Sequence, residues 1–170
     1  GFKRCSIKFC IGIINGVSKL PEEEQGGEIW AQYGTFNRKQ LAVDVTGPVN
    51  ESGDLLYRLI ALGRDSDTQV DYVEDDGYVL PPSLTWRATD DTSITLLLNR
   101  QENKGQVSAQ FLPQAGTLEP GSQGFIGSER FVGEPGWDRY DREKTEATLF
   151  VDHQLNSNWA VSATGRYIDS

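Results

Sequence analysis

The side chain best suited to acid–base chemistry is His153, the sole histidine of the 170 residues. It directly follows Asp152, and no motif places a nucleophile beside it. The Gly-x-Ser-x-Gly elbow of serine hydrolases and the phosphate-binding loop of nucleotide enzymes are both missing from the sequence. One hypothesis makes His153 a general base, but the sequence favours an interfacial residue in a strand.

Two other groups have the residue types of metal or redox sites. Cys5 and Cys10 are the only cysteines, and no histidine or second cysteine pair lies nearby to complete a metal-binding set. A small disulfide in an oxidising compartment is one interpretation, and unpaired thiols at the chain end are the favoured one. An acidic stretch resembles a calcium loop only loosely, because the spacing and glycine of an EF-hand are absent. A solvated loop is favoured for this stretch, which holds Asp65, Asp67, Asp71, Glu74, Asp75 and Asp76.

Composition limits the classes of partner and of membrane segment. The chain has 16 basic and 25 acidic residues, a net charge of -9 and a pI near 4.6, so nucleic acid is not an expected partner. No apolar run reaches the roughly 18 residues that a membrane-spanning helix needs. The absence of methionine and of a secretory signal predicts that this is a fragment or a processed piece.

The elements that must position these residues are strands, because apolar and polar residues alternate with period two. Short turns, such as those at 50–54, 90–92 and 156–158, alternate with longer polar connections. Stretches of about ten residues with this alternation are typical of a transmembrane β-barrel wall. We therefore predict an all-β, antiparallel up-and-down meander of about seven strands, a partial transmembrane β-barrel. The predicted strands lie at about 28–33, 40–46, 55–64, 78–87, 94–99, 147–151 and 159–167.

Alternation also predicts which side of each strand faces lipid. Charged residues at inward positions would line a lumen, since an arginine on the lipid side at the bilayer midplane costs about 2 to 4 kcal/mol. Pro81 and Pro82 are the exception in the pattern, because proline cannot donate to a strand ladder. Aromatic residues lie near predicted strand ends, as interfacial girdles require. The residues expected to face the lumen are Asp44, Arg58, Arg64, Arg87 and Arg166.

Several stretches resemble a known family. Residues 12–21, Gly-Ile-Ile-Asn-Gly-Val-Ser-Lys-Leu-Pro, are similar to the segment that ends the plug domain of TonB-dependent outer-membrane receptors. Residues 33–36, 57–59, 82–87 and 111–118 resemble the ferrichrome and ferrioxamine branch of that family, in the same order. The resemblance covers 12–170, whereas residues 1–10 do not match.

This resemblance implies a parent barrel of about 22 strands around an N-terminal plug. Residues 1–26 would be a remnant of the plug end and linker, and 27–170 the N-terminal part of the barrel. The parent would bind and import iron–siderophore complexes across the outer membrane of a Gram-negative bacterium, with energy from the TonB complex. Its expected partners are a ferric siderophore, outer-membrane lipid and TonB. No cofactor is expected to bind directly, since the iron is carried as a siderophore chelate, and no enzymatic activity is expected.

The resemblance also implies a ligand site in the long loop predicted at 103–141. Phe111 lies where related ferrichrome receptors present an aromatic side chain to the bound chelate, and Gln110 would add a hydrogen bond. An aromatic wall suits a siderophore because a flat ring buries much area at low entropic cost. Trp137 and Tyr140, with their neighbours Asp138 and Arg139, would line the same mouth. The alternative is that these residues only pack the loop together.

Two other functions stay open at this point. A soluble all-β ligand-binding module would show a soluble monomer with cooperative unfolding, whereas a receptor fragment would need detergent. A barrel enzyme would lose hydrolytic activity when His153 is changed. The sequence alone does not identify the chelate.

Overall fold

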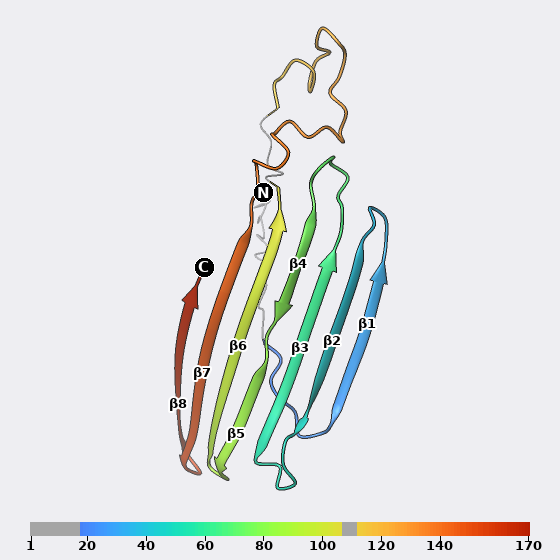
Figure 1. The fold of residues 1–170 in the computed structure, drawn as a ribbon. Helices are drawn as coiled ribbons and strands as arrows, with labels where there is room; N and C mark the ends of the chain where they lie inside the picture. Colours follow the sequence, from blue (N-terminus) through green and yellow to red (C-terminus); the bar gives the residue numbers. More distant parts are fainter. Residues whose placement is uncertain (1–17, 107–111) are drawn as a thin grey trace, which may run out of the picture.

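The computed structural model describes residues 18–106 and 112–170, and this part of the chain is a single antiparallel sheet (Figure 1). Cys5, Cys10, Gln110 and Phe111 lie outside the described residues. Among the described residues, no helix has the length and apolar character needed to cross a membrane. The strands are β1 (Gly26–Tyr33), β2 (Lys39–Pro48), β3 (Leu55–Asp65), β4 (Asp75–Leu80), β5 (Ser83–Thr89), β6 (Thr92–Gly105), β7 (Arg142–Asn156) and β8 (Trp159–Asp169).

The strands follow one another as a meander, which confirms the predicted fold class. Neighbours pair in the order β1-β2-β3-β4-β6-β7-β8, and β5 also lies between β3 and β6. Tight turns join β2 to β3, β5 to β6 and β7 to β8 at one end of the sheet. The longer connections lie at the opposite end, where the segment between β6 and β7 extends beyond the strands (Figure 1). The expected alternation of short and long connections is therefore confirmed.

The single strand predicted at 78–87 is wrong, because β4 ends at Leu80 and β5 begins at Ser83. Pro81 and Pro82 separate them, since neither has an N–H for the ladder. The register does not change across this break: Leu80 lies opposite Arg100 and Ser83 opposite Leu97. The carbonyl of Pro82 still accepts a hydrogen bond from the Leu98 amide at 2.9 Å. The sheet thus contains eight strands at the seven expected positions.

One side of the sheet, the outer face, is apolar and uncovered. Cross-strand rows on it join apolar residues, such as Leu84, Leu96 and Leu149. Antiparallel registry places these side chains on the same face, where each is about 40% exposed. A large uncovered apolar face is what contact with lipid requires. Other exposed members of the outer face are Ile29, Leu41, Leu59, Trp86, Val161 and Tyr167.

The other side, the inner face, carries the predicted charged residues. Thr46, Arg58 and Ser83 form one cross-strand row, and Arg166 lies opposite Thr148 in another. No second layer of sheet covers either side of the described residues, whose buried apolar side chains are only Ala42, Leu56, Val73 and Phe131. A water-soluble sandwich needs two packed layers around a core, so the soluble alternative is not favoured.

Candidate functional site

The connection between β6 and β7 contains the predicted ligand residues that the structure describes. Its two stems are held together where the Tyr140 amide donates to the Gly105 carbonyl at 2.8 Å. Trp137 is 83% exposed and Tyr140 is 64% exposed, both on the limb that returns to β7. Gln110 and Phe111 lie outside the described residues, so their contacts with this limb stay a prediction.

A closed turn presents Trp137 to solvent. The Trp137 amide donates to the Glu134 carbonyl at 3.0 Å, and Gly136 takes the left-handed backbone that this tight turn needs, with φ of 87°. The Asp138 carboxylate accepts a hydrogen bond from the Glu134 amide at 2.7 Å. Asp138 therefore stabilises the turn. The indole of Trp137 beside it is largely exposed and is not packed into the loop.

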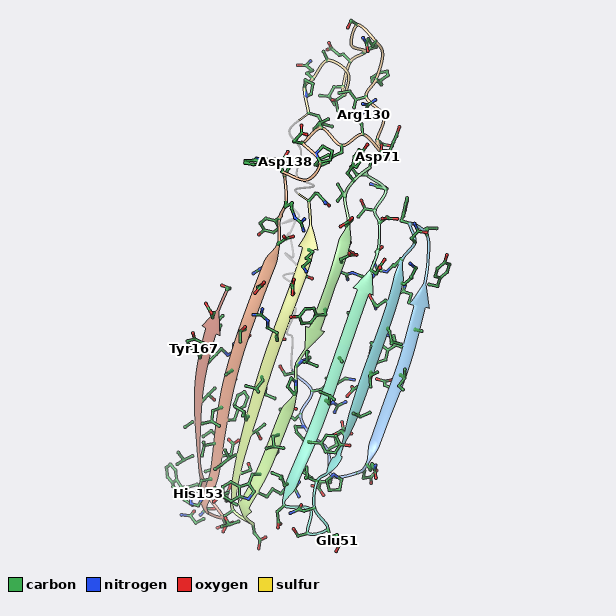
Figure 2. The ribbon with its side chains drawn as sticks, viewed as in Figure 1. Glu51, Asp71, Arg130, Asp138, His153 and Tyr167 are labelled. Atoms are coloured by element: carbon green, nitrogen blue, oxygen red, sulfur yellow. The ribbon has the colours of Figure 1, made fainter. Side chains whose placement is uncertain are left out.

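Sequence reasoning missed the contact between this connection and the one that joins β3 to β4. The Asp71 amide donates to the Glu129 carbonyl at 2.8 Å, and Figure 2 shows Asp71 and Arg130 close together at the same end of the sheet. Val73 and Phe131, one from each connection, are the buried apolar side chains at this end. The available signal was the presence of apolar residues in both loops, and without long-range contacts it does not identify which of them are buried together.

The acidic stretch 65–76 makes contacts that explain several of its carboxylates. Asp75 accepts hydrogen bonds from Arg64 at 2.5 Å and from Arg38 at 3.4 Å. Asp67 accepts from the Asn37 side chain at 2.7 Å, and Asp76 from the Ser66 amide at 2.9 Å. These carboxylates thus hold the β3–β4 connection and the start of β4 against β3 and the β1–β2 connection.

The inner face carries a buried ion pair near the turn-side end of the sheet. Asp44 of β2 and Arg58 of β3 are 2% and 7% exposed. The Arg58 Nε and Nη2 atoms each donate to a different Asp44 oxygen at 2.8 Å, which is the bidentate geometry that arginine prefers. The prediction that both residues face inward is confirmed, but their pairing was not anticipated.

His153 lies on β7 beside the β7–β8 turn, at the end of the sheet opposite the long connections (Figure 2). Its Nδ1 lies 2.9 Å from the Thr92 hydroxyl, the residue directly opposite it in the register. The Thr92 hydroxyl also accepts a hydrogen bond from the Thr89 hydroxyl at 2.9 Å, so His153 joins the polar contacts of the β5–β6 turn. Its interpretation as an interfacial residue stays a prediction.

Comparisons of the sequence and of the fold with known proteins agree on the class of protein that this chain resembles. No protein-family model matches the chain. A ferrioxamine B receptor of Salmonella typhimurium is 35% identical over 159 residues, covering 92% of this chain and 22% of the receptor. The ferrichrome outer membrane transporter and phage receptor of Escherichia coli is 28% identical over 159 residues, covering 94% of this chain and 21% of the transporter.

A solved structure of Pseudomonas aeruginosa FpvA bound to a pyoverdine–iron complex superposes with a TM-score of 0.78 at 20% identity. That match covers 88% of this chain and 20% of the FpvA chain, and it supports the fold alone. The chain spans about a fifth of the length of the relatives and structures it matches. Taken with the apolar outer face and the charged inner face, these matches show that the chain is similar, over most of its length, to a segment of TonB-dependent outer-membrane siderophore receptors.

Proposed function

We propose that the chain is part of an outer-membrane receptor that binds a ferric siderophore outside the cell and imports it with energy from TonB. The single observation that carries this proposal is the one-layer sheet, apolar on the outer face and charged on the inner face. A wall of this kind can separate lipid from an aqueous lumen. Residues 1–26 would be the plug end and linker, and 27–170 the first barrel strands.

We expect that this sheet does not transport a ligand by itself. Within residues 18–106 and 112–170, β1 and β8 each pair with one neighbour only, so each leaves one edge without a partner there. In hydrocarbon every unpaired backbone group costs several kcal/mol, and a barrel avoids this cost by closing. The full receptor would close the sheet with further strands.

The ligand would bind beyond the strand ends that carry the long connections. The proposed wall consists of Phe111, Gln110, Trp137 and Tyr140, and the exposed fractions of the last two leave them free to contact a ligand. The iron would arrive inside its organic chelator, so the protein would contact apolar faces and polar rims of the ligand and would not coordinate the metal. The function is transport without chemical conversion, so no catalytic residue is assigned.

The test uses the complete receptor in cells that lack other hydroxamate receptors. Trp137→Ala, Tyr140→Ala and Phe111→Ala each remove one aromatic side chain, whose burial is worth about 1.5 to 3 kcal/mol. We expect each to weaken binding of a ferric hydroxamate by roughly ten- to a hundredfold. Tyr33→Ala is the matched control, since Tyr33 is 79% exposed on the outer face of β1.

Unchanged affinity in all three variants would remove these residues from the ligand wall. Failure of the unmodified receptor to take up any ferric siderophore would count against the proposed function itself. Surface amounts of each variant are measured with an antibody, so that a change in uptake is not confused with a change in folding.

A further inference from the structure

Residues 19–23, here called the anchor segment, are held against the inner face just before β1 begins. Lys19 Nζ donates to Asp44 at 2.7 Å, and Glu22 accepts from Arg58 Nη1 at 2.7 Å. The carbonyl of Leu20 accepts from the same Nη1 at 3.0 Å. The segment therefore binds to both members of the buried ion pair.

Two further contacts extend the attachment along the wall. The Glu22 amide donates to the Thr46 hydroxyl at 2.9 Å, and that hydroxyl donates to the Tyr57 carbonyl at 2.9 Å. Glu23 forms an ion pair with Arg87 of β5. Contacts within five successive residues thus reach β2, β3 and β5. A displacement of this segment would have to break them together.

The buried ion pair orients Arg58 toward the anchor segment. Nε and Nη2 of Arg58 donate to Asp44, which fixes the plane of the guanidinium and directs Nη1 toward residues 20 and 22. With the segment in place, Arg58 is 7% exposed and Nη1 has two partners. Departure of the segment would break both of these charge-assisted hydrogen bonds, which typically contribute more to stability than bonds between neutral groups.

We propose that the anchor segment stays fixed to the inner face throughout transport, so that any rearrangement of the preceding chain ends at Lys19. This inference rests on the proposed function, because it states where movement would end in a chain on which TonB acts. The strands from β1 onward would then keep their positions while the preceding chain moves. The anchor segment would be the boundary between the moving and the static part.

A covalent lock tests this directly in the complete receptor, in a Cys5→Ser, Cys10→Ser background. Glu22→Cys and Thr46→Cys place one thiol on the anchor segment and one on β2, at two residues that lie close enough for the Glu22 backbone amide to donate to the Thr46 hydroxyl. If the segment is static, the oxidised receptor takes up its ferric siderophore within twofold of the rate after reduction. Uptake that is blocked by oxidation and restored by a reductant would overturn the proposal.

A second measurement does not depend on transport. A nitroxide label at Ser18→Cys reports the mobility of the segment in the purified receptor. The triple variant Lys19→Gln, Glu22→Gln, Glu23→Gln weakens the anchor but keeps the Asp44–Arg58 pair, and we expect the label to move severalfold faster in it. Glu24→Gln is the matched control, because no ion pair is recorded for Glu24 among the described residues.

Equal label mobility in the triple variant, the control and the parent would overturn the anchor whatever the uptake results. Conversely, a parent that takes up no ferric siderophore but shows the expected mobility difference would refute the proposed function and keep the anchor as a structural attachment. The two failures are therefore distinguishable.

Discussion

Removing the carboxylate of Asp44 is the most informative perturbation of this wall. In Asp44→Ala, Arg58 loses both bidentate bonds, and Lys19 loses its 2.7 Å partner. Removing one member of a buried ion pair typically costs about 3 to 5 kcal/mol, because the other charge stays buried. Arg58 keeps Glu22 as a partner, so we expect the lower value, about 3 kcal/mol.

The measurement is the free energy of unfolding of the complete receptor in lipid vesicles, followed by tryptophan fluorescence in urea. A double-variant cycle adds Arg58→Met and the combined change. We expect the combined variant to be more stable than the sum of the single changes predicts, since no charge is then left unpaired. Asp152→Ala is the control: this carboxylate also lies on the inner face, but no ion pair is recorded for it among the described residues.

Strict additivity of the two single changes, within about 0.5 kcal/mol, would refute the reasoning. So would an Asp44→Ala cost no larger than that of Asp152→Ala, which we expect to be about 0.5 kcal/mol. Either result would mean that water or other groups replace the carboxylate without cost.

Three further outcomes follow from the same structure. Leu96→Arg, on the outer face, should destabilise the receptor by about 2 to 4 kcal/mol in vesicles, whereas Ser93→Arg on the inner face should be tolerated. Phe131→Ala removes a buried ring worth about 3 kcal/mol locally, so trypsin should cut after Arg130 much faster than in the parent. The hydrogen bond to Asp44 raises the pKa of Lys19, so this attachment should persist at and below the usual lysine pKa and weaken only as pH rises through the higher folded value, which label mobility at Ser18→Cys would show.

The wall could be predicted from the sequence because strand alternation is a local property. Leu84 and Trp86 point outward and Thr85 inward whatever lies beside them, and the register confirms this division. Pro81 and Pro82 stood out in the pattern because proline lacks a donor, yet a single strand was predicted there, and the separation of β4 from β5 was not predicted.

The contacts made by distant segments could not be predicted in this way. Asp44 and Arg58 both read as inward polar residues, yet their bidentate pairing depends on the register of β2 against β3. The anchor segment and the contact between Asp71 and Glu129 depend on chain paths that periodicity does not encode. Turn-forming residues around Trp137 predict that this loop side chain is exposed, but they do not predict which ligand it contacts.

Pro81 and Pro82, which separate β4 from β5, affect how the two halves of this wall are connected. Because Pro81 and Pro82 contribute no donors, the upper and lower halves of this strand are joined mainly through β3 and β6. The lower half carries Ser83 next to Arg58, and the upper half leads to the connection that contacts Glu129. The wall therefore lacks two backbone donors at this point, while the unchanged register and the Pro82 carbonyl keep β4 and β5 in line along β6.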